Sequence, residues 1–313
     1  MPSLRRRHVL LGALCAAGST FRTSAQPAHA TVVVPFAAGS APDTVARLLV
    51  EPMAAELGTP VVVENQPGAG GMVGVAHVAR ATADGRTMVL SGDAALVMPD
   101  PQGLRRYDPV RDLAPVSRLV VTPNVLVVGT GLGVSDLAGL MAWVRSQPPG
   151  TVSYASVGAG TSSHRGGQLL ARRLGVPLVH VPNAQSPLPD VVAGRVGLFF
   201  ANVATAMPLV REGRLVALGV ASAQRSPIAP ELPTLSESGL PDFESAAWFA
   251  LLAPGGTPDM ALERWQRAAR AAMGSTVVRA RLQALGIEPV GSTAAELRAT
   301  IEQETRRWAA LAE

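Results

Sequence analysis

Small polar residues gather at two places where a run of β-forming residues gives way to a helical pattern. The first is the segment 35–43, PFAAGSAPD, and the second is the segment 154–164, YASVGAGTSSH. Small residues at such a junction allow backbone N–H groups to face a ligand, and the positive end of the following helix dipole lies beside them. Both loops therefore predict binding of an anion, with no evident group for covalent chemistry.

The side chains in these loops suggest how an anion would be held. Gly39 and Ser40 offer backbone N–H groups, and Asp43 falls in the first helical turn, where a carboxylate is favourable. Thr161 and Ser162 add hydroxyl groups in the second loop, and His164 is interpreted as a hydrogen-bonding residue at the helix start. A plain strand-to-helix turn with Asp43 as a capping acid is the alternative for the first loop.

Two further loops give weaker signals. The segment 65–71, NQPGAGG, resembles a dinucleotide loop but lacks the G-x-G-x-x-G spacing, and a turn with several glycines at positive φ explains it equally well. Asn183 and Asn202 offer amides to a cleft, with turn and capping roles as the alternative.

The sequence gives little support for an enzyme or for a metal-binding protein. A hydrolase using Ser162 or Ser163 with His164 is the enzymatic alternative, but no G-x-S-x-G motif is present and these residues are too close in sequence to define a triad. His77, His164 and His180 lack the spacing of metal ligands. We therefore predict a protein that is not an enzyme and uses no metal or cofactor.

The amino-acid composition argues against further classes of function. All basic residues are arginine, so lysine-dependent chemistry is excluded, and Cys15 is the only cysteine. Residues 1–30 hold four of the 27 basic residues and no acid, which leaves 23 basic and 23 acidic residues in the remainder. This balance argues against nucleic acid or a membrane surface as a partner.

The first thirty residues read as an export signal. Arg5 to Arg7 precede the apolar segment 9–18, and small residues around Ala25 and Ala30 are cleavage candidates. A twin-arginine signal and a plain secretory signal both fit this pattern. Leu14 is bulky where a lipoprotein signal needs a small residue before Cys15, so we predict an exported periplasmic protein that is not a lipoprotein.

The remaining chain alternates short β runs with helical windows, which predicts an α/β fold with parallel-dominated sheets. Helical windows at 259–273, 277–285 and 293–312 follow one another without a predicted strand between them. Continuous strands at 123–129 and 247–254 are the predicted joins between two lobes. Lobe 1 would comprise 31–125 and 251–313, lobe 2 would comprise 126–250, and a ligand cleft would lie between them.

Several segments in collinear order resemble the tripartite tricarboxylate transporter substrate-binding family, the Bug-type extracytoplasmic solute receptors. They are VVPFAAGSAPD (33–43), VVVENQPGAGG (61–71), YDPVRDLAPVS (107–117), PNVLVV (123–128), YASVGAGTSSH (154–164), HVP (180–182), RSPIAPELPTLSESGLPDFESAAWF (225–249) and LGIEPVG (285–291). The resemblance covers essentially the whole chain after the signal. It implies a two-lobed, type II-like periplasmic binding protein fold that closes around a small carboxylate.

The resemblance also implies positions for the ligand-binding residues. Those carried over are Phe36, Ala37, Gly39, Ser40 and Asp43 from one lobe, and Gly158, Gly160, Thr161, Ser162, His164 and Asn202 from the other. The chain departs from the family pattern at Gly39-Ser40, where two glycines are usual, at Gln66, at 183–185, and at Gly197 and Ala201. These departures leave the identity of the carboxylate open.

The function implied is capture of a small organic carboxylate by lobe closure and its delivery to membrane transporter subunits, by a monomeric protein. Closure would follow from ligand contacts that stabilise the closed form over the open one. A ligand-sensing adaptor that presents its closed form to a sensor kinase is the second hypothesis, because the sequence does not distinguish the two partners.

Overall fold

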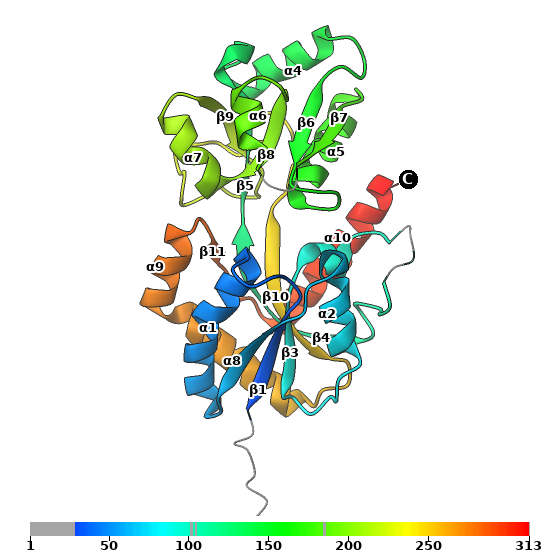
Figure 1. Ribbon diagram of the computed structural model, residues 1–313, viewed down its shortest axis with the longest axis vertical. Helices are drawn as coiled ribbons and strands as arrows, with labels where there is room; N and C mark the ends of the chain where they lie inside the picture. Colours follow the sequence, from blue (N-terminus) through cyan, green and yellow to red (C-terminus); the bar gives the residue numbers. More distant parts are fainter. Residues whose placement is uncertain (1–28, 101–102, 104, 184–185, 313) are drawn as a thin grey trace, which may run out of the picture.

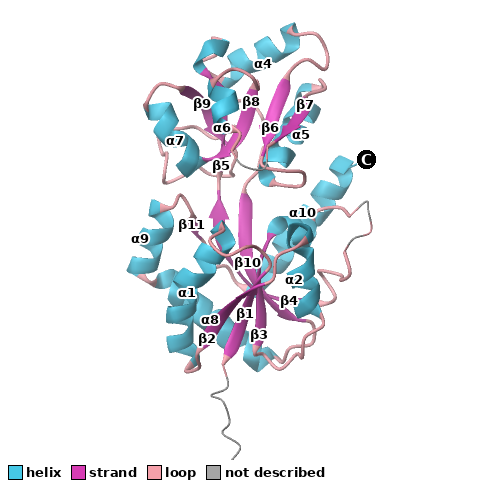
Figure 2. Cartoon of the chain, viewed as in Figure 1, coloured by secondary structure: helices cyan, strands magenta, loops and turns pink. Residues whose placement is uncertain are grey.

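The computed structural model describes residues 29–100, 103, 105–183 and 186–312. The chain forms two lobes, each built on one β-sheet with helices on both faces (Figures 1 and 2). The chain passes between the two sheets at Pro123 and again shortly before Ala247. The C-terminal helix rises from the first lobe alongside the second (Figure 1). The predicted two-lobed α/β fold is therefore confirmed.

Six strands form the sheet of lobe 1, in the order β11-β4-β10-β3-β1-β2. Their bounds are β1 Ala30–Val34, β2 Val61–Asn65, β3 Thr87–Gly92, β4 Leu113–Thr122, β10 Ala247–Pro254 and β11 Glu288–Pro289. Helices α1 (Ala41–Leu57), α8 (Asp259–Gly274) and α9 (Thr276–Ala284) cover one face. Helices α2 (Met72–Ala79), α3 (Asp93–Val97) and α10 (Ala294–Ala312) cover the other.

Five strands form the sheet of lobe 2, in the order β7-β6-β8-β5-β9. Their bounds are β5 Asn124–Gly129, β6 Ser153–Ser156, β7 Val179–Pro182, β8 Leu198–Asn202 and β9 Leu215–Val220. Helices α4 (Leu137–Ser146) and α5 (Ser162–Leu174) pack on one face, and α6 (Leu188–Val192) and α7 (Val203–Arg211) pack on the other. Short 3₁₀ turns, Ala69–Gly71 and Thr130–Leu132, precede α2 and α4.

Both sheets are mixed, so the prediction of parallel-dominated sheets is wrong. β1 pairs in parallel with β2 and β3, and β6 with β7 and β8. β10 and β5 pair in antiparallel fashion with both of their neighbours. The reason is topological: β5 enters lobe 2 directly from β4, and β10 returns to lobe 1, so neither is preceded by the helical crossover that makes strands parallel.

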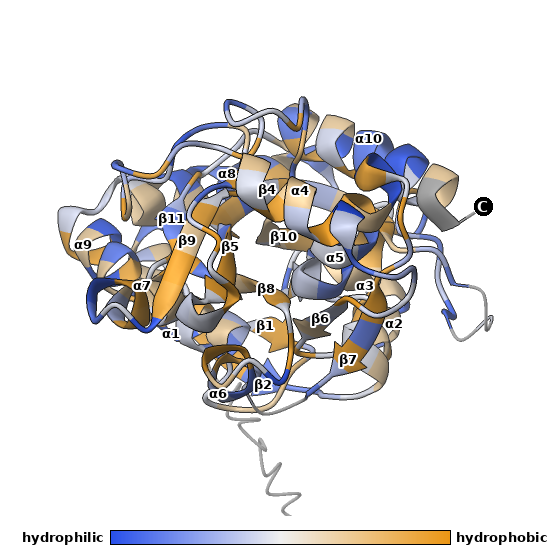
Figure 3. Cartoon of the chain, turned by 90° about the horizontal axis from the view of Figure 1, so that it is seen from above, coloured by the Kyte–Doolittle hydropathy of each residue, from blue (hydrophilic) through white to orange (hydrophobic). Residues whose placement is uncertain are grey.

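The apolar residues of strands and helices meet in the cores predicted by their periodicity. In α1, Val45, Leu49 and Met53 recur on one face and are fully buried against the sheet. In α5, Gly166 and Gly167 allow close packing on the strands, because a Cβ at Gly167 would lie 2.0 Å from the Tyr154 ring. Seen from above, the strands are largely apolar and the outer helix faces carry hydrophilic residues (Figure 3).

Three elements escaped prediction. β4 contains Pro115 and Arg118, which interrupt its apolar pattern, yet it pairs along β10 through two register shifts. α3 has only five residues and β11 only two, too short for a periodic signal. Because β11 lies between α9 and α10, the last three helices do not follow one another without a strand.

The predicted export segment 1–30 overlaps the fold at its last residue. Ala30 begins β1, is 6% exposed, and its N–H donates to the carbonyl of Pro60 at 2.8 Å. Cleavage after Ala30 would remove this first strand residue, whereas cleavage after Ala25 keeps it. The chain passes between the two sheets at Pro123 and again shortly before Ala247, and the residue-level lobe boundaries at 125 and 250 stay predictions.

The lobes also touch on either side of these passages. On one side, Ser226 Oγ donates to Glu288 Oε1 at 2.6 Å, and the turn at Gly286 approaches the start of α7 at Ala204. On the other side, α10 reaches lobe 2, where the Arg307 guanidinium donates to the Glu244 carbonyl at 3.0 Å. The relative position of the lobes is therefore set by contacts far apart in the sequence.

We predict that Gly286→Ala destabilises the protein. Gly286 has φ +71°, and an added Cβ would lie 1.9 Å from the Cβ of Ala204. Overpacking and left-handed strain should together lower the free energy of unfolding by roughly 2–4 kcal/mol, measured by urea denaturation.

Two further variants separate the effect of overpacking from that of backbone strain. Ala204→Gly in the same chain removes the closest of these contacts and should restore part of the loss. Gly274→Ala is the control, because nothing lies within 4 Å of the Cβ position there. Equal stabilities of Gly286→Ala and Gly274→Ala would contradict the close contact between the lobes.

Candidate ligand-binding site

The turn between β1 and α1 carries the first predicted loop and lies at the end of lobe 1 that faces lobe 2 (Figure 1). Gly39 has φ +79°, a conformation that favours glycine. Ser40 is the N-cap residue of α1, and its hydroxyl donates to the carbonyl of Ala37 at 2.6 Å. The loop is thus a compact turn held by its own hydrogen bonds.

Asp43 organises this turn from within. Its carboxylate accepts hydrogen bonds from Gly39 N at 2.8 Å, Asn65 Nδ2 at 2.9 Å and Arg47 Nε at 2.9 Å. The hydrogen bond from Arg47 is the main cause that lowers the pKa of Asp43 to about 2. Asn65 also donates to the carbonyl of Phe36 at 3.1 Å. The Asp43 carboxylate therefore fixes the loop, as the alternative interpretation of Asp43 as a capping acid predicts. It also links the loop to β2 through Asn65.

The turn between β6 and α5 carries the second predicted loop. Thr161 is the N-cap residue of α5, and its hydroxyl donates to the Gly158 carbonyl at 2.7 Å and accepts from the His164 N–H. The buried Ser163 hydroxyl accepts from Val157 N at 3.2 Å. Gly158 and Gly160 have φ of +140° and +76°. The loop shares small residues and positive φ with the first, and in addition its N-cap side chain caps the following helix.

His164 has a structural role in this loop. Its Nδ1 accepts a hydrogen bond from Gly160 N at 3.1 Å, and its ring lies 4.2 Å from that of His180. Burial lowers the pKa of His164 to about 4, and the charges of His180 and Arg165 act in the same direction. The ring is therefore neutral at pH 7 and keeps the lone pair that accepts from Gly160.

The hydrolase arrangement is not formed among the residues the structure describes. His164 Nδ1 is engaged by the Gly160 backbone, and Ser163 Oγ by Val157 and Thr161. Ser156 Oγ lies 2.6 Å from His180 Nε2, but Ser156 is fully buried and also bonds to Gly158. These serines and histidines shape the loop.

A cavity of about 270 Å³ lies beside the second loop. Its walls come from the starts of α5, α6 and α7, from β8 and from the passage between β4 and β5. The lining residues are Thr122, Asn124, Val157, Ser162, Ser163, Ser186, Pro187, Leu188, Phe199, Phe200, Asn202 and Thr205. None of these described residues is charged, so an anion here would be held by hydroxyls, amides and helix N-termini.

The structure brings two of the predicted residues to this cavity, Ser162 and Asn202. Asn202 also caps α7, because its Oδ1 accepts from Ala204 N at 2.9 Å. The other predicted residues of lobe 2, Gly158, Gly160, Thr161 and His164, form the loop behind Ser162. The predicted residues of lobe 1, Phe36, Ala37, Gly39, Ser40 and Asp43, lie in the β1–α1 turn and outside the cavity's lining.

Thr122, Asn124 and Thr205 were missed by the sequence-based prediction. Thr205 lies one helical turn after Asn202, which is a signal that could have found it. Thr122 and Asn124 flank Pro123 at the passage between lobes, and only the fold places them beside α5 and α7.

The departures from the family pattern have structural positions as well. Asn183 Nδ2 donates to the Ser186 carbonyl at 3.3 Å and to Asp190 at 3.2 Å, next to the lining segment 186–188. Gln66 bonds to the exposed Glu64, and Ala201 is buried in the core under α7. Gly197 precedes β8 and does not line the cavity, whereas positions 184–185 lie outside the described residues.

Among the described residues, no helix combines the length and the apolar character that a bilayer crossing requires.

Comparison with known proteins gives a family match over most of the chain. Residues 45–313 match the model of the tripartite tricarboxylate transporter family receptor. A UPF0065 protein in the tcbD-tcbE intergenic region of Pseudomonas sp. is 37% identical over 98% of this chain and 94% of its own.

Two solved structures combine similarity in sequence and in fold. MatC (Rpa3494) from Rhodopseudomonas palustris with bound malate is 33% identical with a TM-score of 0.73, covering 91% of this chain and 99% of its own. R. palustris Rpa4515 with adipate is 32% identical with a TM-score of 0.74, covering 91% and 96%.

We predict that His164 makes stability depend on pH between about 6.5 and 4. The unfolded chain binds the proton near the usual pKa of 6.5, and the folded chain only near 4, so unfolding is favoured progressively as pH falls through this window. His164→Asn keeps an acceptor for Gly160 N but has no proton to take up. Its melting temperature should fall less between pH 7 and pH 4 than that of the parent, by roughly 2–4 °C.

His77→Asn is the matched control, since His77 lies in the last turn of α2 and belongs to neither loop. Parallel pH curves for the parent and His164→Asn would show that His164 titrates as a solvated side chain.

Proposed function

Because the chain belongs to the tripartite tricarboxylate transporter receptor family, we propose that it is a periplasmic solute-binding protein that captures a small organic carboxylate between its lobes. It is a receptor of a family of substrate-binding proteins and not an enzyme. In this proposal the ligand is delivered to membrane transporter subunits, and the protein works as a monomer without a cofactor.

The observation that carries this proposal is the chemistry of the cavity wall. Ser162 and Ser163 stand at the start of α5, and Asn202 and Thr205 at the start of α7, so two helix N-termini and four neutral polar side chains meet one cavity. Such groups favour an anion without a counter-ion. The carboxylates bound by MatC and Rpa4515 support the same chemical class.

In this proposal, the β1–α1 turn of lobe 1 contacts the ligand from the side opposite the lobe 2 cavity wall. The β1–α1 turn, from Phe36 to Asp43, would contribute backbone N–H groups and the Ser40 hydroxyl once the lobes close. Asp43 acts by fixing the turn through Gly39, Arg47 and Asn65. Loops and helix starts held rigidly from within need little reorganisation when a ligand binds.

A thermal-shift screen with mono-, di- and tricarboxylates and aromatic acids tests the proposal. A ligand present at about one hundred times its Kd should stabilise the folded protein by about 2.7 kcal/mol, which is a clear rise in melting temperature. No shift with any carboxylate would contradict the proposed ligand class.

Substitutions then test the site itself. Ser162→Trp fills the cavity from lobe 2, and Ser40→Trp enlarges the opposing turn, so each should abolish the shift produced by the ligand found in the screen. Ser146→Trp is the matched control, because Ser146 is exposed at the end of α4, outside the cavity's lining. Unchanged ligand affinity in both site variants would overturn the placement of the site.

A further inference from the structure

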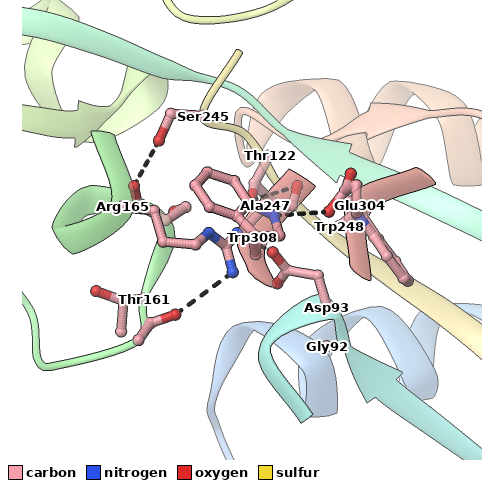
Figure 4. A network of polar contacts seen from close by, with 12 residues as sticks. Gly92, Asp93, Thr122, Thr161, Arg165, Ser245, Ala247, Trp248, Glu304 and Trp308 are labelled. Atoms are coloured by element: carbon pink, nitrogen blue, oxygen red, sulfur yellow. Dashed lines mark hydrogen bonds and ion pairs between the residues drawn. The ribbon is translucent and has the colours of Figure 1, made fainter. Parts of the chain in front are cut away.

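One buried ion pair connects the two lobes. Arg165 of α5 in lobe 2 forms a salt bridge through Nη2 with Asp93 Oδ2, at the start of α3 in lobe 1 (Figure 4). Arg165 is 0% exposed and Asp93 is 5% exposed. The two residues are 72 positions apart. Of the salt bridges described, the others lie at the surface within one lobe or involve a well-exposed arginine.

The Trp308 ring of α10 covers one side of the Arg165 guanidinium. The Arg165 Cζ lies 4.8 Å from the centre of the Trp308 ring, in a cation–π contact with α10. Glu304 accepts hydrogen bonds from Trp308 Nε1 at 3.4 Å and from Trp248 Nε1 at 2.9 Å. Trp248 belongs to β10, the strand that returns from lobe 2 (Figure 4). The pair is thus supported by α10 and by one of the two passages between the lobes.

The same arginine reaches the second ligand loop. Arg165 Nη1 donates to the Gly160 carbonyl at 3.4 Å, and Arg165 follows Ser162 by three residues on α5. Arg165 Nε is buried and has no hydrogen-bond partner among the described residues. The guanidinium therefore joins the loop that carries Thr161 and Ser162 to Asp93 on the opposite lobe.

The energetics make this pair sensitive to lobe separation. When the lobes are together, both charges are out of water and each depends on the other; removal of one partner leaves an uncompensated buried charge. When the lobes are apart, water solvates both. A substitution at one partner therefore penalises the arrangement of the lobes described here far more than one in which they are further apart.

We propose that Asp93 and Arg165 are positioning residues for ligand capture, which hold the α5 loop against lobe 1 and set the balance between the arrangement of the lobes described here and a more open one. The proposal deepens the receptor function, on which it rests, by identifying a contact that acts on closure without touching the ligand. In this proposal, Trp308 of α10 shields the Arg165 guanidinium from water.

Distances between spin labels on the two lobes test this without any ligand. Cys15→Ser leaves the chain free of cysteine, so Glu51→Cys on α1 and Arg145→Cys on α4 give one label on each lobe. Both positions are exposed. Asp93→Asn should raise the ratio of the longer to the shorter distance population roughly tenfold or more in pulsed EPR. Arg165→Met should act in the same direction.

The double variant Asp93→Leu/Arg165→Met removes both charges and should return the distribution towards that of the parent, since apolar replacement of a whole buried pair is often neutral. Asp190→Asn is the matched control; it breaks the pair with Arg195, which lies within lobe 2 and leaves Arg195 largely exposed. Circular dichroism checks that each variant folds, and Trp308→Leu provides a second route to an uncovered arginine.

Unchanged distances in Asp93→Asn and Trp308→Leu would overturn the proposal. A double variant as open as the single variants would also overturn it, because loss of pairing would then not be the cause. The spin-label experiment uses no ligand. A negative result would therefore overturn the role of the Asp93–Arg165 pair without affecting the receptor function, which the thermal-shift screen tests separately.

Discussion

The two passages of the chain between the lobes are joined by hydrogen bonds, and the cavity is built around that junction. Thr122 Oγ1 donates to the Ala247 carbonyl at 3.2 Å, and Asn124 Nδ2 donates to the Ser245 carbonyl. The Ser245 hydroxyl in turn donates to the carbonyl of Ser162 at the start of α5. Thr122, Asn124 and Ser162 all line the cavity, so the junction also places polar groups of the cavity wall.

Charge is distributed so that this region stays neutral. Arg47 is paired with Asp43 in lobe 1, and Arg165 with Asp93 between the lobes. The cavity wall itself contributes hydroxyls, amides and apolar groups. An anion would then be held by oriented dipoles, which need no counter-ion to be desolvated when the lobes close.

Local patterns in the sequence predicted most elements. Val45, Leu49 and Met53 mark α1 by their spacing, and the β-branched run at 32–34 marks β1. β4 was missed because Pro115 and Arg118 break its pattern, and α3 because it is too short. Of the predicted ligand-binding residues, Ser162 and Asn202 line the cavity, whereas its lining residues Thr122 and Thr205 were not predicted.

The sequence by itself determined the two small-residue loops, the helices that follow them, the absence of lysine and the family. These properties depend on neighbours in the chain, through backbone conformation and helical period. Only the tertiary structure decided that the sheets are mixed, that Asp43 faces into its own turn, and that Arg165 meets Asp93 across the lobes. Such contacts join residues from different elements, and their formation depends on strand order and on where the chain crosses, which no local period encodes.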